Sequence, residues 1–130
     1  MRFLDTDVMV DILRGYPPAL EWLGSLGEEE IGIPGFVVME LMDGCASQQE
    51  LNQLQTELAP YLIYWPTAED CDRALSDFAR AHLSRNLSIL DALIGEGAIG
   101  AQAVLCTFNT RHFKAIPGLV TEQPYIKRNH

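Results

Sequence analysis

Short apolar runs alternate along the chain with longer stretches in which apolar and polar positions follow a helical period. Runs at 2–5, 31–33, 62–65 and 103–107 predict short strands, and 119–120 is a candidate fifth strand. Between them, apolar positions spaced three and four apart predict helices. Strands alternating with helices indicate βαβ crossovers, so the pattern predicts an α/β fold with a parallel sheet of four to five strands.

Turn and capping residues divide the helical stretches. Asp7 is predicted to cap a helix over 8–13 that Gly15 ends, and Pro17 or Pro18 opens a helix through 26. A further helix is expected over 36–42. Capping boxes at 47–50 and 67–70 begin two more helices, and Ser88 can cap a last helix that ends near 102.

Size and composition narrow the class of protein. A chain of 130 residues, 48% of them hydrophobic, fits one domain with an ordinary core, expected over 1–130. Its apolar runs are too short to cross a bilayer, and the N-terminus does not resemble a signal peptide, so no membrane association is expected. Cys45, Cys71 and Cys106 lack metal-ligand spacing and are typical of free thiols in a cytoplasmic protein. A mobile basic tail is predicted from about 126.

The formal net charge of −9 argues against non-specific binding to a polyanion. It is compatible with an ordinary acidic surface, with a basic partner segment, or with acids gathered at a site that a cation neutralises.

Oxygen-bearing side chains lie where the predicted strands end. Asp5 ends the first strand, Glu40 lies one turn into the helix after the second, and Asp91 lies in the first turn of its helix. Asn109 follows the fourth strand, and Thr107 at the end of that strand is an accessory candidate. Sites in open parallel sheets lie beyond the carboxyl ends of the strands. Because converging carboxylates repel, this arrangement predicts a hard cation such as Mg²⁺ or Mn²⁺.

Each of these residues also has a purely structural explanation. Asp91 lies three residues after Ser88 and could complete a capping box, and Asp5 could cap the first helix. Glu40 could be an ordinary exposed helix residue, and Asn109 could be a turn residue. The functional interpretation depends on their shared position at one edge of the sheet.

Four segments resemble the sequence motifs of PIN-domain proteins, in order and from the first strand almost to the C-terminus. They are Phe3-Leu4-Asp5-Thr6-Asp7-Val8, Val38-Met39-Glu40-Leu41-Met42-Asp43-Gly44, Leu87-Ser88-Ile89-Leu90-Asp91-Ala92-Leu93-Ile94 and Leu105-Cys106-Thr107-Phe108-Asn109. The most similar group is that of VapC-type toxins from toxin–antitoxin pairs.

This resemblance implies a three-layer α/β/α sandwich and cleavage of RNA. Asp5, Glu40 and Asp91 would hold Mg²⁺ or Mn²⁺, and a water activated by the metal would attack the phosphorus in line. It also implies a homodimer and a cognate antitoxin.

The chain departs from the family pattern at two positions. Asn109 replaces the common Asp, which puts a second metal in doubt, and Asp7 stands where Asn or Ser is common. Asp7 could restore the missing charge, or it could be only the helix cap. Arg111 and His112 are candidate contacts for substrate phosphate, and so are Arg14 and Arg85.

Two other functions compete. Asp5-Thr6-Asp7 also resembles the Asp-x-Asp of haloacid-dehalogenase-like phosphatases with Asp5 as nucleophile, but no Asp follows Asp91 to complete that chemistry. Asn109 favours a non-catalytic PIN-like module that only binds RNA or protein, whereas the three acids argue against it.

Overall fold

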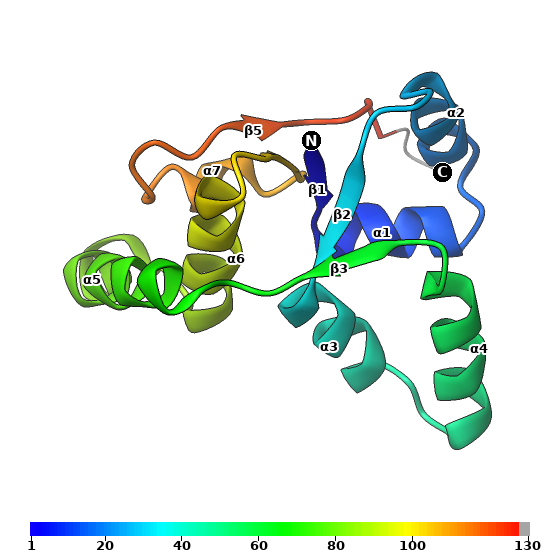
Figure 1. The fold of residues 1–130 in the computed structure, drawn as a ribbon, viewed down its shortest axis with the longest axis horizontal. Coiled ribbons are helices and arrows are strands. Elements are labelled where there is room, and N and C mark those ends of the chain that lie inside the picture. Colours follow the sequence, from blue (N-terminus) through cyan, green and yellow to red (C-terminus); the bar gives the residue numbers. More distant parts are fainter. Residues whose placement is uncertain (128–130) are drawn as a thin grey trace.

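Five parallel strands form one sheet in the structure, a computed structural model that describes residues 1–127 (Figure 1). The strands are β1 (Arg2–Leu4), β2 (Ile31–Pro34), β3 (Leu62–Tyr64), β4 (Val104–Cys106) and β5 (Thr121–Glu122). Their order is β3-β2-β1-β4-β5, and every neighbouring pair is parallel. The predicted parallel sheet is therefore confirmed, and β1 lies at its centre.

Helices cover both faces of this sheet. They are α1 (Thr6–Leu13), α2 (Pro17–Ser25), α3 (Gly35–Asp43), α4 (Gln48–Leu58), α5 (Ala68–Arg85), α6 (Ile89–Gly100) and α7 (Thr110–Phe113). In Figure 1, α1 and α2 lie on one side of the strands, and α5, α6 and α7 lie on the other. Helix α3 extends below the carboxyl ends of β2 and β1, and α4 lies to its right, beneath α1. The result is the expected three-layer α/β/α sandwich.

The central strands are buried because both of their faces meet helices. Leu4, Ile33 and Leu105 have no exposed surface, and Phe3 is 2% exposed. Near-continuous apolar runs are what a parallel sheet covered on both faces requires. Gly32 shows how closely the chain packs there, because a Cβ at this position would lie 2.5 Å from the ring of Tyr64.

Side-chain caps confirm most of the predicted helix starts. The hydroxyl of Ser47 accepts from the Glu50 backbone N–H, and that of Ser88 accepts from the Asp91 N–H. Thr67 and Asp70 form a complete capping box at the start of α5. These contacts satisfy backbone donors that have no partner within the helix.

Several elements differ from the prediction by a residue or more, and three of them matter for the site or the sheet. The first strand ends at Leu4, because Asp5 already caps α1. The fifth strand is Thr121–Glu122 and not 119–120, since Thr121 and Glu122 pair with Leu105 and Cys106 of β4. The short helix α7 was not predicted, because four residues are too few to show a helical period.

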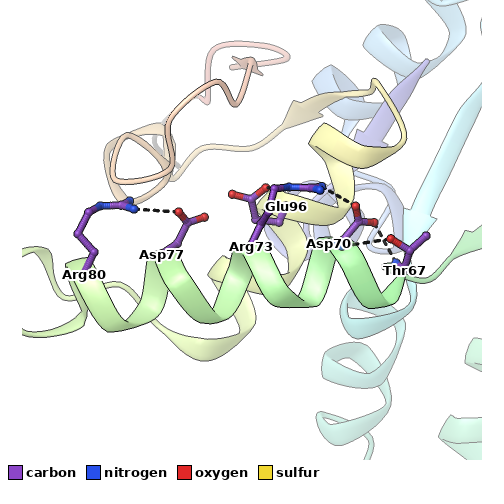
Figure 2. A network of polar contacts seen from close by, with 6 residues as sticks. All are labelled: Thr67, Asp70, Arg73, Asp77, Arg80 and Glu96. Atoms are coloured by element: carbon purple, nitrogen blue, oxygen red, sulfur yellow. Dashed lines mark hydrogen bonds and ion pairs between the residues drawn. The ribbon is translucent and has the colours of Figure 1, made fainter.

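Charged residues connect α5 to α6 (Figure 2). Arg73 donates to Asp70 at 2.5 Å and to Glu96 of α6 at 2.9 Å. Arg80 donates to Asp77 at 3.1 Å and to the Ala115 carbonyl at 2.9 Å. The three carboxylates are each no more than 5% exposed, so these arginines compensate charges that would be costly to bury alone.

The last described residues lie against α1. Tyr125 donates its hydroxyl hydrogen to Asp11 at 2.7 Å, and Lys127 forms an ion pair with Asp11 at 3.2 Å. Arg128 and His130 lie outside the described residues, so the mobile tail stays a prediction. Cys45, Cys71 and Cys106 are free thiols, as expected. Within residues 1–127, no helix is long and apolar enough to span a bilayer.

Candidate active site

Asp5 is the most buried of the candidate acids, with 6% of its surface exposed. It directly follows β1 and caps α1, and its Oδ1 accepts from the Thr6 backbone N–H at 2.8 Å. Its Oδ2 accepts from the Thr107 hydroxyl at 2.8 Å. Thr107 comes from the end of the neighbouring strand β4, so the parallel pairing of β1 and β4 brings these two residues together.

Burial and neighbouring charge act together on Asp5. Burial, the charge of Asp7 and the charge of Asp91 raise its pKa to about 6, against the lowering effect of its two hydrogen bonds. A raised pKa means that the ionised carboxylate is not fully compensated by the protein. A bound cation would supply the missing compensation.

Asp7 is fixed by two backbone donors. Its Oδ1 accepts from the Val8 N–H at 2.8 Å, and its Oδ2 accepts from the Phe108 N–H at 2.9 Å. Burial raises the pKa of Asp7. The prediction that Asp7 caps the first helix is wrong, because Asp5 holds that position and leaves Asp7 inside the first turn. Asp7 instead connects α1 to the loop that follows β4.

Asp91 and Glu40 come from two different helices, α6 and α3. Asp91 lies in the first turn of α6, where burial raises its pKa, and His112 Nδ1 lies 3.9 Å from its Oδ2. Glu40 is half-buried on α3 and accepts from the Thr6 hydroxyl at 3.0 Å. Both acids line one hollow of about 420 Å³.

The structure therefore gathers the acids at one end of the sheet without a finished coordination shell. Within residues 1–127, no set of three or more His, Cys, Asp or Glu side chains lies close enough to hold a metal. Asp5 and Asp91 interact electrostatically, whereas Glu40 joins them through Thr6 and through the hollow that it shares with Asp91. Water ligands commonly complete a magnesium shell, so the donor chemistry fits a hard cation.

The remaining candidates surround this group. Asn109 is exposed at the start of α7, and its backbone N–H donates to the Thr107 hydroxyl at 3.0 Å. Arg111 and His112 are exposed on α7. Arg14 lies at the opposite end of α1 from Asp5, and Arg85 is in the last turn of α5.

Thr6 was not singled out from the sequence, although it contacts both Asp5 and Glu40. Its place in the Asp-Thr pair after a strand was the available signal. The aromatic wall formed by Phe78 and His82 beside Asp91 was also missed, since nothing local in the sequence of α5 places it there.

Comparison with known proteins agrees with this architecture. Residues 2–119 match the family model of the PIN domain. The chain is 35% identical over 129 residues to Ribonuclease VapC19 of Mycobacterium tuberculosis, a match that covers 96% of this chain and 100% of the relative.

Solved structures show the same fold. A toxin–antitoxin complex from Klebsiella pneumoniae is similar with a TM-score of 0.76 at 23% identity, over 96% of this chain and 98% of that chain. VapBC2 from Rickettsia felis, bound to a DNA fragment from its promoter, is similar with a TM-score of 0.76 at 26% identity, over 93% and 96% of the two chains. A parallel sheet with acids beyond its strand ends, a matching family model and a full-length relative lead to one conclusion: the chain belongs to the PIN domain family.

Proposed function

We propose that this chain is an endoribonuclease that depends on Mg²⁺ or Mn²⁺ and cleaves RNA phosphodiester bonds. The observation that carries the proposal is the buried Asp5 carboxylate, whose pKa is raised by burial and by the charges of Asp7 and Asp91. A cluster of carboxylates such as Asp5, Asp7 and Asp91 is electrostatically unfavourable without a bound cation. The full-length similarity to a relative named a ribonuclease supports RNA cleavage as the reaction in which the cation would act.

Asp5, Asp91 and Glu40 are the residues that would hold the metal. Thr107 would keep Asp5 in place through its hydroxyl, and Asn109 would orient a water or ligand through its amide. A bound divalent ion would lower the pKa of a water molecule and neutralise charge that develops on a phosphoryl oxygen. One metal fits this set better than two, because Asn109 brings no charge.

The surrounding residues have supporting roles in the proposal. Asp7 adds negative charge close to Asp5 and ties α1 to the Phe108 backbone. Arg111 and His112 would contact substrate phosphate from α7, and His112 already lies near Asp91. Thr6 would hold Glu40 in place through its hydroxyl.

The test is cleavage of single-stranded RNA in Mg²⁺ or Mn²⁺ against EDTA. Asp5→Asn and Asp91→Asn are expected to lower the rate at least 100-fold, because each removes a charged ligand. Asp72→Asn, an exposed acid on α5, is the matched control and is expected to retain full activity. Cleavage that survives both site substitutions would contradict the proposal.

Thermal unfolding supplies a second, independent readout. Mn²⁺ is expected to stabilise the wild-type protein and the Asp72→Asn control, but not Asp5→Asn. Binding of RNA without any metal-dependent cleavage would favour the second candidate, a non-catalytic module. Asn109 and the incomplete ligand set are the features that favour it. The phosphatase alternative is set aside, because the match to the PIN domain family covers residues 2–119.

We further propose that the chain acts as the toxin of a toxin–antitoxin pair, as a homodimer that a cognate antitoxin inhibits. Several structures of similar fold are toxin–antitoxin complexes. The net charge of −9 is suited to a partner segment with basic residues. Co-expression with the product of a neighbouring gene should yield a stable complex and suppress cleavage. A neighbouring product that neither binds nor inhibits would remove this part of the proposal.

A further inference from the structure

The hollow beside the candidate acids also has an aromatic wall, formed by Phe78 and His82 of α5. Glu40 and Asp91 share this hollow of about 420 Å³ with residues from α5 and from the start of α6. The other lining residues are Phe78, His82, Ser88, Ile89 and Leu90. Its volume lies within the range of ligand pockets, roughly 300–1,000 Å³.

Phe78 and His82 form a stacked pair within this wall. Their ring centroids lie 4.4 Å apart, and the ring planes differ by 23°. His82 Nδ1 lies 3.1 Å from the Leu87 carbonyl oxygen. A carbonyl only accepts, so Nδ1 donates in this contact, and the ring is fixed at two points. His82 is exposed, and Phe78 stacks on one of its faces.

The polar residues in its lining distinguish this hollow from the groove beside it. The neighbouring groove of about 330 Å³ is lined by Cys71, Ala74, Leu75, Phe78, Ile89, Ala92 and Leu93, all apolar. That lining suits a packed protein surface. The hollow instead combines two carboxylates, a hydroxyl and an imidazole with an aromatic face, which suits a ligand that has both a flat ring and polar edges.

We propose that this hollow is a base-binding subsite, in which one base of single-stranded RNA stacks on His82 while the adjoining phosphate lies toward the cation that Asp91 and Glu40 would hold. The inference rests on the proposed function and assigns His82 as a residue that determines substrate affinity. Unstacked bases of single-stranded RNA are commonly bound on aromatic side chains.

The negative charge of the chain gives base stacking a larger share in binding RNA. Nine Lys and Arg against eighteen Asp and Glu leave little attraction for phosphates. Stacking does not depend on phosphate charge, so it can hold RNA where the electrostatic contribution is small. The fixed ring of His82 also loses little rotational freedom when a base stacks on it.

The test compares His82→Ala with His82→Phe, which keeps an aromatic face. Leu83→Ala is the matched control, because Leu83 is 95% exposed on the same helix and does not line the hollow. His82→Ala is expected to raise KM for cleavage of a single-stranded RNA heptamer about tenfold, with kcat within about twofold. His82→Phe should recover most of that loss because it keeps an aromatic face, and Leu83→Ala should stay near wild type. Stabilisation by Mn²⁺ should be unchanged in all three.

A binding measurement separates this inference from the proposed function. A heptamer with one 2-aminopurine and a non-hydrolysable backbone should lose fluorescence on binding wild-type protein in Mg²⁺, and His82→Ala should abolish that quenching. This result would support the subsite even if no RNA were cleaved, an outcome that would remove only the nuclease proposal.

Three results would overturn the base-binding subsite. The first is a wild-type KM together with unchanged quenching in His82→Ala. The second is an equal rise in KM for His82→Ala and His82→Phe. The third is a change of oligomeric state in His82→Ala and Leu83→Ala with RNA binding intact, which would assign this face to a protein contact.

Discussion

Thr107 connects the two central strands at the residue scale. It is fully buried, donates to Asp5 Oδ2 and accepts from the Asn109 backbone N–H. Thr107→Val keeps the shape but leaves Asp5 Oδ2 and the Asn109 N–H without the hydrogen bonds that Thr107 makes to them. It should cost ~2 kcal/mol of unfolding free energy and weaken metal binding, because an uncompensated buried group carries its full desolvation cost.

Thr107→Ser is the matched control for that change, since it keeps the hydroxyl and removes only a methyl group. It should cost ~1 kcal/mol and leave Mn²⁺ affinity unchanged. Urea denaturation and calorimetric titration with Mn²⁺ measure the two effects. Equal losses of metal affinity in both variants would show that the hydroxyl does not hold Asp5 in place.

Asp5 itself gives the metal-free protein a defined pH dependence. Its folded pKa of about 6 lies above the 3.8 of a free Asp, a difference worth ~3 kcal/mol. A raised carboxyl pKa contributes stability that is complete below 3.8 and lost as pH rises through about 6. Without metal, unfolding free energy should therefore fall between pH 5 and pH 7.5.

Asp5→Asn should flatten this pH dependence, while the exposed control Asp72→Asn should keep it. Stabilisation of the wild-type protein by Mn²⁺ should also grow from pH 5 to pH 7.5, because the ionised ligand is more abundant at the higher pH. Urea denaturation at the two pH values, with and without Mn²⁺, measures both. A metal-free protein that is more stable at pH 7.5, with Asp5→Asn showing the same trend, would contradict the argument.

Helix α6 shows, at the element scale, how glycine positions differ in what they tolerate. A Cβ on Gly97 would make an ordinary contact with Pro66 at 3.6 Å, whereas one on Gly100 would overlap with the Asp70 carboxylate. Gly97→Ala should add ~0.5–1 kcal/mol of stability through helix propensity. Gly100→Ala should destabilise, because Asp70 is held by Thr67 and Arg73. Thermal unfolding of the two variants measures both changes in stability. Equal changes would contradict the packing described around Gly97 and Gly100.

One buried carboxylate at the contact between α5 and α6, that of Asp77, is only partly compensated by hydrogen bonds (Figure 2). Asp77 Oδ2 is buried and has no hydrogen-bond partner among the described residues. Burial first, and then a hydrogen bond that Glu96 can donate to Asp77 only in its protonated form, raises the pKa of Glu96. Stability from Glu96 is therefore complete below pH 4.5 and is lost as pH rises through its raised pKa.

Asp77→Asn should reduce that loss, because an amide can donate to Glu96 and carries no charge. The ion pair with Arg80 is lost together with the buried charge that it compensates, so its loss should add little to the effect. Urea denaturation at pH 5 and pH 8 measures the difference, with Asp72→Asn as the control on the same helix. A larger loss of stability at pH 8 than at pH 5 in Asp77→Asn would show that the pair is not repulsive.

These elements also show what the sequence could and could not reveal. Apolar runs and caps located the strands and most helices, and the strand-end rule singled out Asp5, Glu40 and Asp91, whose role as metal ligands stays a prediction. The strand at Thr121–Glu122 was misplaced because its pairing with β4 is a long-range contact, while the more apolar Val120 is 59% exposed. Tertiary packing likewise places His82 of α5 beside Asp91, and no local pattern could show it.

The charge of the whole molecule predicts how salt affects RNA binding. Each phosphate contact on single-stranded RNA changes the slope of log K against log salt by about −0.7. If Arg111 and one further cation make the phosphate contacts, the slope should be about −1.4. Arg111→Ala should make it shallower by about 0.7. Arg14→Ala should not change it, because Arg14 lies at the far end of α1 from Asp5.

Fluorescence anisotropy of a labelled RNA heptamer between 50 mM and 300 mM KCl measures these slopes. Stacking on His82 should appear in the same titration as an affinity that salt does not remove, so His82→Ala should lower every point about equally and leave the slope unchanged. A wild-type slope steeper than about −3, with Arg14→Ala making it shallower, would mean that phosphates bind far from α7. The RNA would then follow a path across α1, and Arg111 would not be its main contact.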